Sequence, residues 1–190
     1  FPELMVGDAS KNLRRVFYLT DAVRKSARGD SGIQRLHVVG AGVMGGDIAA
    51  VGAMAGLDVT LTDMNEAAID GAIARAAKLF ERRLKTDDKI AAAKSRLRAD
   101  KDGNGTGDAD LIIEAVAEKL AVKQAVFQAL EAASKPDAIL ATNTSAIPLE
   151  DIATALKAPE RLIGLHFFNP VPVLPLVEVI WSEFSDQNIV

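Results

Sequence analysis

Leu36-His37-Val38-Val39-Gly40-Ala41-Gly42-Val43-Met44-Gly45 is the stretch of this 190-residue chain from which its architecture can be read. A short apolar run leads into the spacing Gly-x-Gly-x-x-Gly, which is typical of the turn that binds a dinucleotide between a strand and a helix. In such a turn Gly40 allows a tight reversal, Gly42 lets the backbone approach a pyrophosphate, and Gly45 lets the helix pack close to the strand. The phosphates would lie at the helix N-terminus, where free N–H groups and the helix dipole favour anions.

The glycines alone are a weak indication of a cofactor, and a carboxylate further along the chain strengthens it. Asp63 lies 23 residues after Gly40, at the end of the next strand-like run, Val59-Thr60-Leu61-Thr62. A carboxylate at this place binds the ribose hydroxyls of NAD and repels the additional phosphate of NADP. The sequence therefore predicts NAD as the cofactor and Asp63 as the residue that selects it.

The composition is that of an ordinary globular domain, with 49% hydrophobic and 25% charged residues. A net charge of -4 gives no reason to expect a nucleic acid or an anionic membrane as a partner. The absence of cysteine excludes disulfides and thiolate metal sites, and no run of about 18 apolar residues indicates a membrane span. Without a secretory signal we expect a cytoplasmic enzyme. The first residue is Phe1 rather than Met, so we expect a piece of a longer protein.

Strand-like and helix-like segments alternate along the chain from Gln34 onward. This alternation predicts an α/β fold of the Rossmann type, a doubly wound and mostly parallel sheet with a helical insertion after the second strand. We expect strands at 35–39, 58–62, 96–99, 110–116, 138–142, 162–166 and 176–180. We expect a helix at 43–55, two helices within 65–95 that separate near 86–88, one on which Val122, Val126, Phe127 and Leu130 lie near one face, and a short one at 149–156.

The first 25 residues form a predicted helix of their own. Leu13, Val16, Phe17 and Val23 fall on one side of it, with basic residues elsewhere. The polar, glycine-containing stretch 26–32 follows and predicts a linker. This segment has no core of its own, so we expect it to pack on another domain.

Polar side chains follow the carboxyl ends of several predicted strands. Ligands of open α/β sheets bind at this edge, so these residues are the candidates for a site. They are Asp63 after the second strand, Glu118 and Lys123 after 110–116, Asn143, Thr144 and Ser145 after 138–142, and His166 and Asn169 after 162–166.

Glu178 follows His166 by twelve residues and stands in an otherwise apolar strand. Burying a carboxylate without a partner is costly, and His166 is the obvious partner. Such a pair gives an oriented imidazole with a raised pKa, which suits a general base near neutral pH. The alternative, a structural ion pair with no catalytic role, stays open at this point. His37, inside the first strand, is interpreted as a structural histidine.

No metal site is predicted. Residues 100–105 match the start of a calcium-binding loop, Asp-x-Asp-x-Asn-Gly. The twelfth position of such a loop is a bidentate glutamate, and here it is Leu111. We interpret this stretch as a polar turn between two strands.

Residues 34–182 resemble the NAD-binding domain of the 3-hydroxyacyl-CoA dehydrogenase family. The segment 1–25 resembles the helix that joins an enoyl-CoA hydratase domain to this domain in bacterial multifunctional fatty-acid oxidation proteins. The first resemblance rests on Gly40-Ala41-Gly42-Val43-Met44-Gly45-Gly46, Ile113-Glu114-Ala115-Val116, Asn143-Thr144-Ser145 and His166-Phe167-Phe168-Asn169-Pro170-Val171, in the family's order and spacing, and the second on Asn12-Leu13-Arg14 and Val16-Phe17-Tyr18-Leu19.

The resemblance implies an NAD-dependent enzyme that oxidises (S)-3-hydroxyacyl-CoA to 3-oxoacyl-CoA in fatty-acid β-oxidation. His166 would be the base that takes the proton of the 3-hydroxyl group, and Glu178 would orient it. Ser145 and Asn169 would complete the catalytic set by holding the substrate oxygen and the cofactor near His166. The cofactor-binding positions would be Gly40, Gly42, Met44, Gly45, Asp63, Ala117, Glu118, Lys123 and Ser145.

The chain departs from the family at two places. Asp47 lies in the first turn of the phosphate-binding helix, where a carboxylate would weaken pyrophosphate binding unless it points away. The family's helical C-terminal domain, which covers the cleft and binds acyl-CoA, is missing, since the chain ends at Val190. We therefore divide the chain into a linker helix with its linker (1–33), the NAD-binding domain (34–184) and the start of the missing domain (185–190).

We expect this piece to bind NAD and to be nearly inactive, and its parent to be an oligomer with a hydratase domain upstream. Two other functions stay open. One is another NAD-dependent hydroxyacid dehydrogenase, although such enzymes commonly use a lysine in place of the His166–Glu178 pair. The other is a nucleotide-binding module without catalysis, although Ser145, His166, Asn169 and Glu178 are all present.

Overall fold

The computed structural model describes residues 7–26 and 31–189. The chain divides into two compact units, Phe1–Gly32 and Ile33–Val190. In the first unit the helix α2 (Asp8–Ser26) exposes Leu13, Val16 and Phe17. The side chain of Val23 and most of the expected linker, 27–30, lie outside the described part of the chain. None of the described helices is long and apolar enough to cross a membrane.

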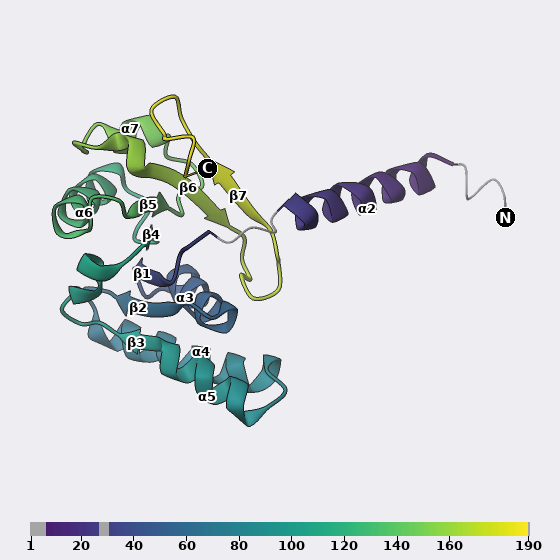
Figure 1. Cartoon of the computed structure of the whole chain (residues 1–190), viewed down its shortest axis with the longest axis horizontal. Coiled ribbons are helices and arrows are strands. Elements are labelled where there is room, and N and C mark those ends of the chain that lie inside the picture. Colours follow the sequence, from purple (N-terminus) through teal and green to yellow (C-terminus); the bar gives the residue numbers. More distant parts are fainter. Residues whose placement is uncertain (1–6, 27–30, 190) are drawn as a thin grey trace. The chain divides into compact units, whose positions relative to one another are not determined.

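The second unit is built on one seven-stranded sheet with the strand order β3-β2-β1-β4-β5-β6-β7. Neighbouring strands run parallel except β7, which runs antiparallel to β6. The chain winds outward in opposite directions from β1 and β4, so the predicted doubly wound, mostly parallel sheet is confirmed (Figure 1). The strands are β1 (Arg35–Val39), β2 (Asp58–Thr62), β3 (Leu97–Ala99), β4 (Leu111–Glu114), β5 (Ile139–Thr142), β6 (Leu162–Phe167) and β7 (Val177–Ile180).

Helices pack on both faces of this sheet, and a hydrophobic cluster lies under each layer. One cluster joins α3, α4 and α5 to the sheet and includes Val38, Leu61 and Phe80. The other joins α6 and α7 to the sheet and includes Phe127 and Ile152. The predicted helical insertion after β2 consists of α4 and α5. The helices are α3 (Val43–Ala55), α4 (Glu66–Arg83), α5 (Asp87–Arg96), α6 (Leu120–Ala133) and α7 (Leu149–Ala153), with 3-10 turns η1 (Asn104–Asp108) and η2 (Pro159–Arg161).

Two expectations for the middle of the chain are wrong. β4 ends at Glu114 rather than Val116, because the Glu114 carboxylate accepts a hydrogen bond from the Val116 N–H (2.7 Å) and the backbone leaves the ladder there. On α6 the side chain of Lys123 is buried, whereas that of Val122 is 39% exposed. The buried charge of Glu114 holds Lys123 inside, and a pattern of apolar residues does not reveal such a pair.

The described chain ends in turns that stay attached to the sheet. The buried hydroxyl of Ser185 donates to the carbonyl oxygen of Leu162, at the start of β6 (2.9 Å). The N–H of Ser182 donates to the same hydroxyl oxygen (3.1 Å). No helix begins at Ser185 within the residues described up to Ile189.

His37 lies fully buried in β1, with Nδ1 2.8 Å from the Thr60 hydroxyl. Burial lowers the pKa of His37, and the carboxylate of Asp100 opposes this only in part. Asp100 itself accepts hydrogen bonds from the N–H groups of Asn104 (3.1 Å) and Gly105 (2.7 Å). The calcium-like stretch thus contains a turn that its own first carboxylate closes.

The buried His37 predicts that stability falls in mild acid. The unfolded chain takes up a proton near the ordinary histidine pKa of 6.5, whereas the folded chain resists protonation. Stability is therefore complete above that value and is lost as the pH falls below it, by at most about 1.4 kcal/mol per pH unit. His37→Asn, whose amide keeps a partner for Thr60, should flatten this slope. Urea unfolding of both proteins at pH 5.5, 6.5 and 7.5 measures it, and equal slopes would contradict the assignment.

Candidate functional site

Packing within the protein requires a glycine at two positions of the glycine turn, but not at the third. Gly40 has a φ of +106°, and a Cβ there would lie 2.6 Å from the Ala115 carbonyl oxygen. A Cβ on Gly45 would lie 1.8 Å from the Gly40 carbonyl oxygen. A Cβ on Gly42 would meet no protein atom within 4 Å, and no side chain caps α3 at this residue. The open space at Gly42, in front of an uncapped helix N-terminus, fits a pyrophosphate group.

Asp63 lies directly beside this turn. One of its carboxylate oxygens accepts a hydrogen bond from the Ala41 N–H (2.7 Å), and the other accepts one from the Asn65 N–H (2.8 Å). The two bonds tie the end of β2 to the turn after β1 and fix the carboxylate in one orientation. Asp63 therefore has a role in bracing the turn as well as the place expected of a ribose ligand.

A pocket of about 390 Å³ lies at the carboxyl edge of the sheet, next to the glycine turn. It contains half of the residues expected in the site, whereas Gly40, Gly42, Gly45, Asp63, Ala117, Thr144 and Glu178 do not line it. Its lining consists of Met44, Ala115, Val116, Glu118, Lys123, Asn143, Ser145, His166, Phe167, Phe168 and Asn169.

The antiparallel pairing of β6 and β7 places His166 opposite Glu178. Nδ1 of His166 lies 2.8 Å from a carboxylate oxygen of Glu178, so the predicted contact exists. The reason given for it was wrong, because Glu178 is 53% exposed and the strand register, rather than the cost of burial, makes the pair. A carboxylate only accepts, so Nδ1–H donates and Nε2 is the basic nitrogen. The ring of Phe168, with its centroid 4.6 Å away, packs against the imidazole.

Lys123 and Glu118 lie at the back of the same pocket. The Lys123 ammonium lies 2.7 Å from Glu114 and 3.2 Å from Glu118, and its side chain is 1% exposed. Burial opposes ionisation of Glu118, but the Thr144 hydroxyl and the Lys123 ammonium outweigh it and lower the pKa of Glu118. Glu114 did not enter the expected set of site residues. The carboxylate directly after the apolar run Leu111-Ile112-Ile113 is the signal that points to it, since such a charge needs a buried partner.

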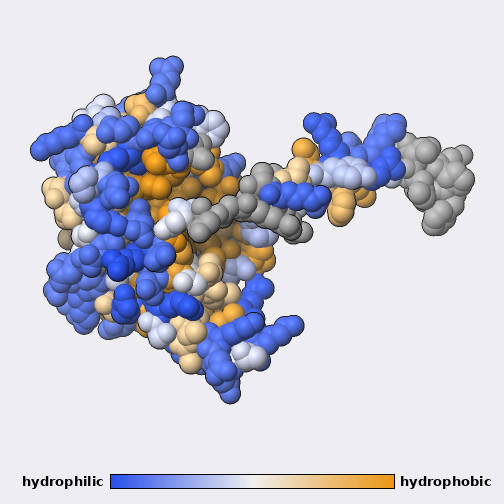
Figure 2. Space-filling model, in the orientation of Figure 1, coloured by the Kyte–Doolittle hydropathy of each residue, from blue (hydrophilic) through white to orange (hydrophobic). Residues whose placement is uncertain are grey.

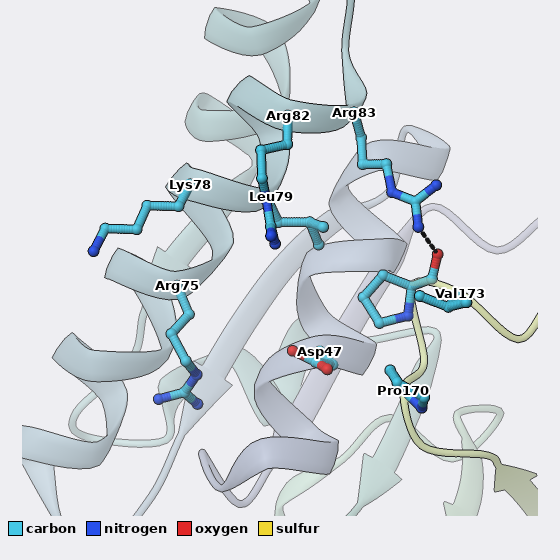
Figure 3. A pocket seen from close by; sticks show the side chains of 9 residues that line it. Asp47, Arg75, Lys78, Leu79, Arg82, Arg83, Pro170 and Val173 are labelled. Carbon is cyan, nitrogen blue, oxygen red and sulfur yellow. Dashed lines mark hydrogen bonds between the residues drawn. The ribbon is translucent and has the colours of Figure 1, made fainter.

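A second, larger pocket of about 780 Å³ is lined by the basic side of α4. Figure 3 shows Asp47 on α3 with Arg75, Lys78 and Arg82 of α4 on one side and Pro170 on the other. Arg75 donates to the Gly42 carbonyl oxygen (3.2 Å), and Arg83 donates to the Pro172 carbonyl oxygen (2.9 Å). These cations were not among the expected site residues, although Arg75, Lys78 and Arg82 have helical spacing and mark one side of a helix.

Asp47, the departure noted in the sequence, is part of this basic pocket. Burial raises the pKa of Asp47, and the Arg75 guanidinium counteracts that rise. Its negative charge therefore lies among the cations of α4 and is offset by them. This placement reduces the expected repulsion between Asp47 and a pyrophosphate at Gly42.

Comparison with known proteins identifies the family. The model of the family described as "3-hydroxyacyl-CoA dehydrogenase, NAD binding domain" matches residues 35–190. A 3-hydroxybutyryl-CoA dehydrogenase of Mycobacterium tuberculosis is 46% identical over 160 residues, which are 82% of this chain and 56% of that protein. A fatty acid oxidation complex subunit alpha of Pseudomonas syringae is 38% identical over 198 residues, covering 100% of this chain and 28% of the relative.

Solved structures agree with these relatives. The crystal structure of M. tuberculosis FadB2 superposes with a TM-score of 0.79 at 45% identity, covering 83% of this chain and 57% of that one. A 3-hydroxybutyryl-CoA dehydrogenase from Escherichia coli gives a TM-score of 0.79 at 38% identity, covering 83% and 34%. This chain thus spans between 28% and 57% of the length of these relatives. The chain belongs to the 3-hydroxyacyl-CoA dehydrogenase family and carries that family's NAD-binding domain.

Proposed function

We propose that this chain binds the cofactor and supplies the general base for oxidation of (S)-3-hydroxyacyl-CoA to 3-oxoacyl-CoA in fatty-acid β-oxidation. The observation that carries the proposal is the His166–Glu178 pair (2.8 Å), with His166 in the lining of the pocket beside the glycine turn. A base and a cofactor turn that meet at one sheet edge suit the removal of a proton and a hydride from the same alcohol.

In this mechanism the chemistry that NAD would supply, when bound, is a hydride acceptor for C3 of the substrate. The turn at Gly42 and the carboxylate of Asp63 would hold its pyrophosphate and ribose. Nε2 of His166 takes the proton of the 3-hydroxyl group, and Glu178 fixes the tautomer and stabilises the imidazolium that results. Ser145 and Asn169, which line the same pocket, would donate hydrogen bonds to the substrate oxygen and to the cofactor.

The basic pocket supports a coenzyme A thioester as the substrate class. Coenzyme A carries several phosphate charges, and Arg75, Lys78, Arg82 and Arg83 offer matching cations on one helix. The other wall of the pocket comes from Pro170–Val173, shortly after His166 in the chain (Figure 3). A molecule that lies along this wall has a short route from its phosphates to the base.

In our proposal, the partner of the α/β unit is a further protein region that corresponds to the part of the relatives' length that this chain does not span. Figure 2 shows apolar surface near the centre of the visible face of the α/β unit, around the place of β7 in Figure 1. Such a patch marks an interaction site, and a region that covers it would close the pocket over His166. The exposed apolar residues of β7 and of the chain directly beside it are Val173, Leu174, Leu176, Val177, Val179, Ile180 and Trp181.

Turnover tests the proposed function directly. A protein that covers the relatives' full length should reduce acetoacetyl-CoA with NADH, and this chain alone should bind NADH and show little turnover. If both proteins bind NADH but the longer one shows no turnover, the chain is a cofactor-binding module without catalysis and the proposed activity is wrong. A chain that does not bind NADH in calorimetry would remove the cofactor assignment itself.

Asp63→Ala should weaken NADH binding by about tenfold or more, because a hydrogen-bonded charge is lost at the ribose. It should also raise the affinity for NADPH relative to NADH, since the 2′-phosphate no longer meets a carboxylate. Calorimetric titration with both nucleotides measures the ratio. Asp58→Ala, at the exposed start of the same strand, is the matched control. An unchanged NADPH-to-NADH ratio would mean that Asp63 only braces the turn.

A further inference from the structure

Five side chains form a closed ring of polar contacts behind the His166 pocket. Glu114 accepts from the Lys123 ammonium (2.7 and 3.0 Å) and from the Thr142 hydroxyl (2.8 Å). Lys123 also reaches Glu118 (3.2 Å), and Glu118 accepts from the Thr144 hydroxyl. The N–H of Thr144 donates back to the Thr142 hydroxyl oxygen (3.2 Å), which closes the ring across the ends of β4 and β5.

The ring holds the segment that carries Ser145. The carboxylate oxygen of Glu118 that binds Thr144 also accepts from the N–H groups of Ser145 (3.1 Å) and Ala146 (3.3 Å). The other oxygen of Glu118 faces the Lys123 ammonium. Both oxygens therefore have partners within the protein, so Glu118 organises the backbone after β5 even though it lines the pocket.

The buried pair of the ring, Glu114 and Lys123, contributes little net stabilisation to the fold. Glu114 and Lys123 are 0% and 1% exposed, and removing two charges from water costs about as much as their attraction returns. An apolar pair of similar size would serve packing as well. What the charged pair adds is an ammonium group that is fixed in place and aimed at Glu118.

We propose that Lys123 is a positioning residue that, through Glu118, sets the place of Ser145 at the edge of the cofactor pocket. Glu114 and Thr142 hold Lys123, Lys123 keeps Glu118 ionised and oriented, and Glu118 holds the N–H groups of Ser145 and Ala146. This role is additional to the direct cofactor contact that the family resemblance implies for Lys123, which lines the pocket. A test of Lys123 by NADH binding rests on the proposed function, whereas a test by the backbone amides of Ser145 and Ala146 does not.

The test follows the amide signals of Ser145 and Ala146 by NMR from about pH 2.5 to 7 in this chain. The groups that face Glu118 are Lys123 from α6, the Thr144 hydroxyl and, across the same pocket, His166. In the unchanged protein the two amides should titrate with a midpoint below the ordinary glutamate pKa of 4.5. In Glu114→Gln/Lys123→Met, which removes both buried charges, the midpoint should rise by about one unit or more.

NADH binding supplies the second readout. The double variant should bind NADH about three- to tenfold more weakly, because Ser145 is no longer held in place. Lys119→Met removes an exposed lysine next to Glu118 and is the control; it should change neither the midpoint nor the affinity. If the Met-containing protein does not fold, Glu114→Gln/Lys123→Gln replaces it, since two amides can hydrogen-bond each other.

A folded double variant whose amide midpoint is unchanged would overturn the proposal. The amide result tests the ring even if no protein binds NADH, whereas loss of NADH binding by the unchanged chain strikes only the proposed function. Weaker NADH binding with the midpoint unmoved would also count against Lys123, because the effect would then not pass through Glu118.

Discussion

His166→Ala is expected to lower kcat for oxidation of a 3-hydroxyacyl-CoA by about 10²- to 10⁴-fold, the range that a general base contributes. The physical reason is that no other histidine among the described residues lines the pocket. The measurement is steady-state NADH formation by a protein that covers the relatives' full length. The affinity for NADH should stay within about twofold, because the turn at Gly42 and Asp63 is untouched.

Glu178→Gln is the companion variant, since the amide keeps the side-chain shape and a hydrogen-bond acceptor. It should lower kcat less than His166→Ala does, because Glu178 is half exposed and water stabilises part of the imidazolium charge. An active His166→Ala protein would refute the assigned base and favour a structural role for the pair.

Gly42→Ala and Gly45→Ala are expected to give opposite results. Gly45→Ala should destabilise by more than about 3 kcal/mol, because its Cβ would lie 1.8 Å from a backbone oxygen, and the melting temperature should fall by about 6–12 °C or more. Gly42→Ala should leave the melting temperature unchanged or slightly raised, since Gly42 has an ordinary φ of -62° and free space around it. It should nevertheless weaken NADH binding by about 10- to 100-fold.

Thermal unfolding and calorimetry on the two variants measure both effects. Val43→Ala, an exposed position in the first turn of α3, controls for a small side-chain change near the turn. A Gly42→Ala protein that binds NADH as tightly as the unchanged chain would show that no ligand group approaches this residue. A fully stable Gly45→Ala protein would show that α3 can move away from the turn.

The sheet was predictable because its strands are short apolar runs that end in glycine or a polar residue. β1 and β2 lie within the predicted ranges, and the glycine spacing indicated the order of strand, turn and helix. The helical insertion was readable from its length and from the break at Thr86. Parallel strands that are buried on both faces leave this kind of record in a sequence.

The site was less predictable, because it depends on contacts between distant segments. Lys123 looked like a polar residue at a strand end, and only the buried carboxylate of Glu114 explains why it lies inside. Glu178 was expected to be buried, since its apolar neighbours do not show that β7 is an exposed edge strand. The cations of α4 form a pocket only with Pro170–Val173, about 90 residues later in the chain.

Because β7 is an edge strand, the contact between His166 and Glu178 can open without unfolding of the domain. His166 and Glu178 stand on different strands, and β7 has β6 as its one neighbour in the sheet. Edge ladders open locally at a lower free energy than central strands. Each opening disconnects the imidazole from its carboxylate while the glycine turn keeps its shape. In our proposal, a region that covers β7 also raises the fraction of molecules in which His166 keeps its carboxylate partner, and hydrogen exchange of the β7 backbone amides would report that fraction.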